Sequence, residues 1–223
     1  MRLSFLIASA GALAILAPVA VQAAPPANWD GLAQVNSKRF DLAYLMPGAD
    51  FRGYTKVMLD PTEVAFHKDW QRDYNRSTGL GNRISDKEIE QAIREAAAAA
   101  SDIFTKAFQA GGYTVVTTPG PDVVRVKTGV LNISVTAPDT LSAGRSRTFA
   151  NEAGSAVLFV EARDSSSNAL LGRAVDQKIA GEGGSAYRTG ASNRADFRFM
   201  VERWAKDSVR TLTELKSLAP GSQ

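Results

Sequence analysis

His67 is the one residue of this sequence whose type could do acid–base chemistry near neutral pH, because it is the only histidine and there is no cysteine. A hydrolase would need an orienting carboxylate beside it, which Asp69 could supply, and a serine nucleophile. The sequence has no Gly-x-Ser-x-Gly turn, and Lys68 would lower the basicity of the imidazole. The favoured interpretation is a histidine at a strand end, with no catalytic residue predicted. A hydrolase built on His67 and Asp69 stays open as the alternative.

The residue types also argue against a metal site, and no cofactor is predicted. Zinc needs three or four ligands, and one histidine without cysteine falls short of that set. Residues 164–168 carry oxygen atoms for calcium but lack the acidic density of a calcium loop, so they are interpreted as a hairpin turn. The glycine-rich residues 78–81 and 181–184 match no phosphate-binding motif and are interpreted as connections.

Two groups of side chains could bind a small ligand. Arginines are frequent in the C-terminal half, and Arg145, Arg147 and Arg188 could hold a carboxylate or a phosphate if they converged. Separate solvated arginines are the alternative. Large aromatic residues are frequent in the N-terminal third, and Trp29, Tyr44 and Trp70 could form a platform for a ligand or a glycan. Packing in the core and at its rim is the alternative for these.

Two long helices are expected to position these residues. Ser85 and Glu88 have the spacing of a capping box, and apolar residues recur at three- and four-residue steps until the glycines at 111–112. A second amphipathic pattern begins at about Asn193 and ends before Pro220. Both patterns are typical of helices that pack one apolar face on a sheet.

Strands are indicated by apolar alternation in residues 54–59, 113–118 and 123–135, and by a hairpin over residues 155–180. The alternation in 123–135 changes phase, which indicates a bulge that we place at Gly129. The strand–helix–strand unit over residues 54–118 favours one parallel crossover connection. The predicted fold is therefore α+β, a twisted and mostly antiparallel sheet of about five strands with both long helices packed on one face.

The N-terminus predicts export. Arg2 is followed by an apolar run and by small residues at Val21 and Ala23, which is typical of a signal peptide cleaved after Ala23. Residues 24–28 are then an extended leader, 29–218 a single α+β domain and 219–223 a disordered tail. Because the chain has no cysteine, no lipoprotein anchor and no disulfide are expected. The predicted location is the periplasm or the exterior of the cell.

The charge pattern limits the partners. The formal net charge is +3, and basic and acidic residues are mixed along the chain, so no nucleic-acid partner is predicted. No later segment is apolar enough for membrane insertion after signal cleavage. An envelope protein partner is expected, and a small-molecule ligand is possible.

A string in the N-terminal third carries a resemblance to a known family. It comprises Gly31-Leu32, Asp41, Tyr44, residues 47–50, Tyr54, residues 56–61 and Trp70. With residues 161–164, Asp176 and the Trp204 helix, this string resembles the bacterial envelope family named domain of unknown function 3313. The resemblance implies an envelope location and a single domain over about residues 29–218, and it implies no catalytic residue. Many members of that family are lipoproteins, whereas this chain lacks the anchoring cysteine.

Together these patterns predict an exported, soluble periplasmic protein that is a non-enzymatic accessory or interaction module of the cell envelope. The first alternative is a periplasmic binder of a small molecule or a glycan that uses aromatic or arginine-rich surfaces. The second is the hydrolase centred on His67.

Overall fold

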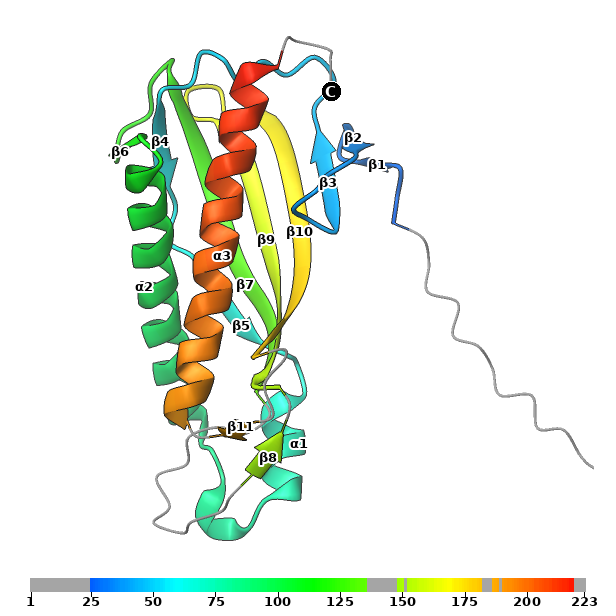
Figure 1. The fold of residues 1–223 in the computed structure, drawn as a ribbon, viewed down its shortest axis with the longest axis vertical. Coiled ribbons are helices and arrows are strands. Elements are labelled where there is room, and N and C mark those ends of the chain that lie inside the picture. The colour runs from blue at the N-terminus through cyan, green and yellow to red at the C-terminus, as the bar shows by residue number, and fades with distance from the viewer. Residues whose placement is uncertain (1–24, 136–147, 151, 182–185, 189, 219–223) are drawn as a thin grey trace, which may run out of the picture.

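A wide sheet is the framework of this protein, in a computed structural model that describes residues 25–135, 148–150, 152–181, 186–188 and 190–218. Nine strands pair in the order β1-β2-β3-β10-β9-β7-β4-β6, and β5 joins β7 (Figure 1). Their bounds are β1 (Asn28–Trp29), β2 (Leu32–Val35), β3 (Leu42–Leu45), β4 (Lys56–Leu59), β5 (Glu63–Phe66), β6 (Thr114–Val116), β7 (Val123–Val135), β9 (Gly154–Asp164) and β10 (Leu170–Ala180).

The α+β class is confirmed, but the prediction of about five strands was wrong. Several of the additional strands are two to four residues long, too short to show an alternating pattern in the sequence. The extended leader proposed for residues 24–28 also overlaps this sheet, since Asn28 belongs to β1. A separate pair consists of β8 (Thr148–Ala150) and β11 (Ala186–Arg188).

Both long helices lie on one face of the sheet, as predicted. They are α2 (Asp86–Ala110) and α3 (Gly190–Ser217), which run side by side in the same direction along the strands (Figure 1). The capping box begins α2 as expected: the Glu88 N–H donates to the Ser85 hydroxyl, and the Ser85 N–H donates to the Glu88 carboxylate at 2.8 Å. A short helix, α1 (Trp70–Ser77), and a 3₁₀ turn (Leu80–Asn82) precede α2.

The long central strands follow the predicted hairpin and crossover. β9 and β10 pair antiparallel around the polar turn, where the Asp164 carboxylate accepts from the backbone N–H of Ser167 at 2.7 Å. β4 pairs parallel with β6, as the strand–helix–strand unit predicted, and it also pairs parallel with β7, which was not predicted. The bulge in β7 was misplaced at Gly129: the register against β9 shifts between Leu131 and Ser134, where Asn132 has a φ of 52°.

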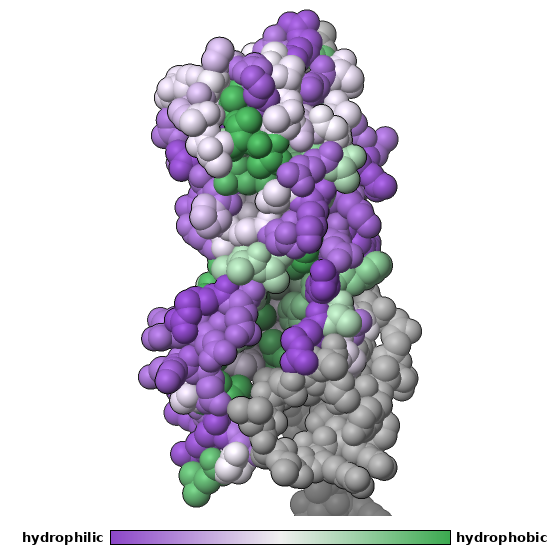
Figure 2. Space-filling view, turned by 90° about the vertical axis from the view of Figure 1, so that its left-hand side faces the viewer, coloured by the Kyte–Doolittle hydropathy of each residue, from purple (hydrophilic) through white to green (hydrophobic). Residues whose placement is uncertain are grey.

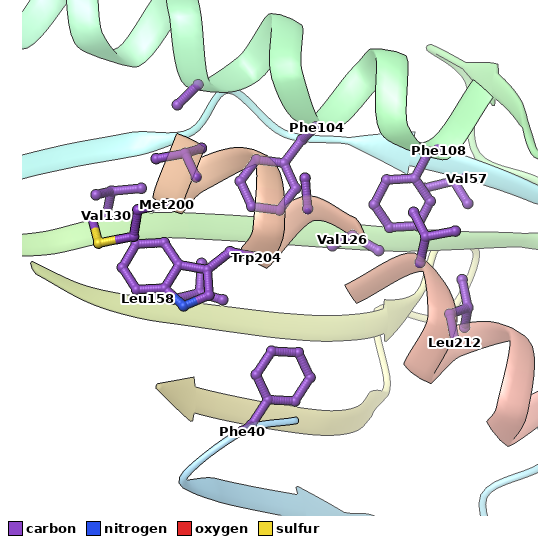
Figure 3. Close-up of a cluster of buried hydrophobic side chains, with 14 of the residues drawn as sticks. Phe40, Val57, Phe104, Phe108, Val126, Val130, Leu158, Met200, Trp204 and Leu212 are labelled. Carbon is purple, nitrogen blue, oxygen red and sulfur yellow. The ribbon is translucent and has the colours of Figure 1, made fainter. Parts of the chain in front are cut away.

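The hydrophobic core lies between the sheet and the two long helices. Phe104 and Phe108 reach from α2 toward the sheet, Trp204 and Leu212 reach from α3, and Leu158 faces them from β9 (Figure 3). On the outside, Figure 2 shows the side of α2 and of the sheet edge, where hydrophobic residues gather only in small patches among hydrophilic ones. None of the helices within the described ranges has the length and apolarity to cross a membrane.

One buried carboxylate joins α3 to the sheet. Asp176 on β10 is 0 % exposed, and the Trp204 indole N–H donates to it at 2.7 Å. The Asp41 backbone N–H donates to its other oxygen at 3.1 Å, and the Lys178 ammonium lies 2.9 Å away. The Asp41 carboxylate in turn accepts from the Gln177 backbone N–H at 2.8 Å. Helix α3, β10 and the start of β3 are therefore fixed to one another by a single polar cluster.

Candidate functional site

The sheet face opposite α2 and α3 carries the polar side chains of the central strands. Val126, Leu158 and Asp176 point toward the helices, so the residues alternating with them point away. On β7, β9 and β10 these outward residues are, in part, Arg125, Lys127, Leu131, Val157, Phe159, Glu161, Arg163, Arg173 and Val175. We name this surface the helix-free face, because α2 and α3, the long helices of the described chain, both pack on the other side.

A nearly buried ion pair lies at the centre of the helix-free face. Glu161 is 8 % exposed, and the Arg163 and Arg173 guanidinium groups approach its carboxylate at 2.6 and 2.7 Å. Glu161 and Arg173 are direct cross-strand partners on β9 and β10. Arg173 also contacts Asp30 at 2.6 Å. The side chains are thus held in place by charge-assisted hydrogen bonds from different strands.

Beside this pair, a hollow of about 500 Å³ extends toward β4 and β5. Two further ion pairs line it, Arg125 with Asp60 at 3.0 Å and Lys127 with Glu63 at 2.8 Å. Both signs of charge alternate around the hollow and are already paired. Such a surface favours a partner that offers polar groups of both signs over a simple anion.

Two of the predicted aromatic residues meet at one edge of the helix-free face. The Trp29 ring lies edge-on to Tyr44, with ring centroids 5.6 Å apart, and the Arg173 guanidinium lies 4.6 Å from the Trp29 ring centroid. Tyr44 is 0 % exposed, and its hydroxyl oxygen has no hydrogen-bond partner within the described part of the chain. Tyr44 is therefore buried beneath Trp29, where a ligand does not reach it.

Trp70 lies in a different cluster. It stacks between Phe66 and Tyr74, at centroid distances of 4.8 and 5.7 Å, and its indole N–H donates to the Val135 carbonyl at 3.1 Å. The three aromatic candidates do not form one platform, because they belong to separate packing clusters.

The arginine candidates lie largely beyond the described structure. Arg145 and Arg147 are outside the described residues, and Arg188 lies in β11 with a side chain that is also outside them. Their convergence on an anion stays a prediction. The arginines that the structure does bring together are Arg125, Arg163 and Arg173. Arg173 is one of the C-terminal arginines that the sequence offered, whereas Arg125 and Arg163 were missed because their association depends on strand pairing.

His67 is exposed at the end of β5. The Asp69 carboxylate contacts Arg72 at 2.8 Å, so this candidate orienting group is engaged by an arginine. Within the residues described, no group of three or more histidine and acidic side chains is placed to hold a metal ion. The candidate site is therefore the helix-free face.

The Glu161 carboxylate gives this face a defined dependence on pH. Burial raises its pKa, but the hydrogen bonds from Arg163 and Arg173 outweigh burial and hold the pKa below the ordinary value of 4.5. Because the folded-state pKa is lowered, the ionised group stabilises the fold above the ordinary pKa. That contribution is lost as the pH falls through the folded-state pKa.

Glu161→Gln is therefore expected to destabilise the protein at about pH 7 and to have a much smaller effect at a second, acidic pH that lies below the folded-state pKa of Glu161, where the wild-type carboxyl is protonated as well. Urea unfolding of both proteins at the two pH values measures the difference. An equal difference at both values would show that the carboxylate charge does not contribute.

The fold and this face define the class of protein: an α+β domain with one sheet face covered by two long helices and ion-paired polar residues on the other. The chain belongs to the family described as Protein of unknown function (DUF3313), whose model matches residues 25–208. That match confirms the family to which the residue string pointed. No curated protein matches the chain.

Solved structures resemble this chain at low identity. Protein XCC0632 from Xanthomonas campestris, of family DUF330, is 12 % identical with a TM-score of 0.39, covering 75 % of this chain and 86 % of its own. The PelC dodecamer from Paraburkholderia phytofirmans is 12 % identical with a TM-score of 0.35, over 74 % and 96 %. A minor lipoprotein from Acinetobacter baumannii is 10 % identical with a TM-score of 0.34, over 72 % and 94 %.

Proposed function

We propose that the protein is exported to the periplasm and acts there as a non-enzymatic interaction module that binds an envelope protein through the helix-free face. The observation that carries this proposal is a patch of partly exposed apolar residues beside the Glu161 ion pairs. Leu131 and Val157 are direct partners on β7 and β9, and Phe159 and Val175 are direct partners on β9 and β10. All of these side chains are neither fully buried nor fully exposed.

The composition of this face is that of a protein interface. The centres of such interfaces are apolar and rich in aromatic residues and arginine, and polar groups form the rim. Here the apolar patch adjoins Arg173 and Trp29, and the paired charges around the hollow lie further along β7 and β9. Because the ion pairs hold these side chains already, a partner would bind with little further ordering.

A glycan platform is the less favoured alternative. Tyr44 is fully buried, and the Trp29 ring is in contact with the Arg173 guanidinium. Tyr44 therefore offers no open face on which a sugar would stack, and a guanidinium already lies over the Trp29 ring.

Site-specific crosslinking in cells tests the proposal. A photo-reactive amino acid at Val157 is expected to capture one envelope protein reproducibly, whereas the same residue at the exposed Arg94 of α2 captures none. The crosslinked chain is expected in the periplasmic fraction with Ala24 as its first residue. Mass spectrometry identifies the captured protein and the first residue of the crosslinked chain.

A second variant separates binding from general adhesion. Leu131→Asp is expected to abolish capture from Val157, because it places a charge in the apolar patch, while circular dichroism stays unchanged. Equal capture from Val157 and Arg94, or capture unaffected by Leu131→Asp, would refute this face as the binding surface.

A further inference from the structure

A large groove lies on the other side of the sheet, where α3 diverges from β3 and β10. Its volume is about 1100 Å³, and it is bounded by the C-terminal half of α3, by residues 34–40 and by the helix-facing side of the sheet. Protein interiors are close-packed, and cavities that hold ligands measure about 300–1,000 Å³. The groove is slightly larger than that range and therefore has room for a ligand.

Small residues on the sheet create the floor of this groove. Ala43 on β3 is the direct partner of Ala174 on β10, and Gly172 is the direct partner of Ala162 on β9. At Gly172 even a Cβ atom would lie 2.7 Å from the Leu45 side chain and 2.9 Å from the Tyr44 carbonyl oxygen. Gly172 thus leaves the room that the Leu45 side chain occupies, and alanines form the floor beside it.

The walls of the groove are apolar. They consist of Phe51, Phe108, Val126, Val160, Leu212 and Leu215. Apolar side chains thus make up much of the interior, beside the hydroxyl groups of Ser208 and Thr211 on α3. This lining favours a hydrocarbon over a strongly polar ligand, because a buried polar group without partners costs free energy.

The mouth of the groove is polar and more basic than acidic. Arg39 bridges it, donating to both carboxylate oxygens of Glu214 on α3 at 2.6 Å. Lys38 is exposed next to Arg39, and Lys38 and Arg210 both contribute to a lowered pKa of Glu214, after the hydrogen bond and charge of Arg39. Asp207 completes the group, 3.8 Å from both Arg39 and Arg210.

We propose that this groove binds a hydrocarbon chain that carries an anionic head group. The chain lies along the floor formed by Ala43, Ala162 and Ala174, and the head group lies at the mouth beside Lys38 and Arg39. An anionic head complements the basic excess there, whereas a cationic head would be repelled. This site is separate from the helix-free face, and so the proposal goes beyond the interaction function and does not depend on it.

Displacement of a fluorescent fatty acid, cis-parinaric acid, measures binding to the purified chain. Palmitate and a lysophosphatidylglycerol with the same chain are expected to displace it. Tighter displacement by one of them distinguishes a free fatty acid from a phospholipid source. Hexadecyltrimethylammonium, with the same chain and a cationic head, is expected to compete at least about tenfold more weakly, which corresponds to about 1.4 kcal/mol.

Two alanine-to-leucine variants test whether the ligand binds on the floor of the groove. Ala174→Leu fills the floor and is expected to weaken palmitate binding at least about tenfold. Ala98→Leu makes the same change on the exposed side of α2 and is expected to leave binding unchanged. Unaltered binding in Ala174→Leu, no displacement by either anionic amphiphile, or equal competition by the cationic one would overturn the proposal.

A cysteine label gives a second measurement that does not depend on the folding of Ala174→Leu. The chain has no cysteine, so Thr211→Cys introduces a single thiol in the lining of the groove. Palmitate is expected to slow its reaction with a maleimide severalfold and to leave Asp102→Cys on α2 unaffected. Equal labelling of Thr211→Cys with and without palmitate would place the ligand elsewhere.

Discussion

Asp176→Ala is expected to lower the free energy of unfolding by about 3–5 kcal/mol, the cost typical of removing one partner from a buried charged cluster. The substitution leaves the buried Trp204 indole N–H and the partly buried Asp41 backbone N–H without their acceptor. Each such donor costs about 1–3 kcal/mol. Urea unfolding followed by tryptophan fluorescence measures the change.

Two further variants show whether the cluster is the cause. Asp102→Ala removes an exposed carboxylate whose partner is Lys106 at 2.7 Å, and a change of less than about 1 kcal/mol is expected. Asp176→Asn keeps the shape and one acceptor, so its effect is expected between the two. A loss for Asp176→Ala no larger than that for Asp102→Ala would mean that the buried hydrogen bonds contribute little.

Phe104→Ala is expected to cost about 3–5 kcal/mol, because the side chain is 1 % exposed and fills the centre of the core between α2 and the sheet. The reason is the loss of buried apolar contact together with the cavity left behind. Phe199→Ala on α3 is the matched control: Phe199 is 61 % exposed, and a change within about 0.5 kcal/mol is expected.

The comparison of the two phenylalanines also tests the helix-on-sheet packing itself. Equal unfolding free energies of Phe104→Ala and Phe199→Ala would show that α2 does not bury its apolar stripe against the sheet. The measurement is denaturant unfolding of both variants beside the wild type, with the slope checked for two-state behaviour.

Local signals explain which parts of the fold were predictable. These parts depend on contacts between residues that are close in the sequence, and each is present in the structure. They are the capping box of Ser85 and Glu88, the polar hairpin turn at 164–168 and the apolar stripes of α2 and α3. β1, β2 and β3 were missed because they are short and because β3 is positioned by pairing with β10, far along the chain. Asn132 rather than Gly129 forms the bulge because the phase of a strand is set by its partners.

Both proposed binding surfaces depend on register in the same way. Glu161 and Arg173 could be read as charged residues in strands, but their contact follows from the pairing of β9 with β10. The alanines of the groove floor have no distinguishing pattern in the sequence, and the floor becomes visible only when the pairing of β3 with β10 places Ala43 opposite Ala174. Among the earlier candidates, Trp29 and Tyr44 do meet, although as packing, while Trp70 packs elsewhere.

The residues that carried the family resemblance include many structural contacts. Asp41, Asp176 and Trp204 form the buried cluster that joins α3 to the sheet. The Tyr54 hydroxyl donates to Asp164 at 2.9 Å, and burial followed by this hydrogen bond raises the pKa of Tyr54. Many residues that carried the family resemblance therefore have structural roles that hold segments of the chain together. This is consistent with the resemblance, which implied no catalytic residue.

The pairing of β3 with β10 also determines the order in which this chain can fold. Ala43 on β3 can pair with Ala174 on β10 only after Ala174 has been synthesised, so this part of the sheet forms when most of the polypeptide is present. Contacts between such distant positions make folding slow, because the entropy of a long loop is lost before the pairing is formed. β1, β2 and β3 can pair with one another early, but the pairing that joins them to the rest of the sheet forms late.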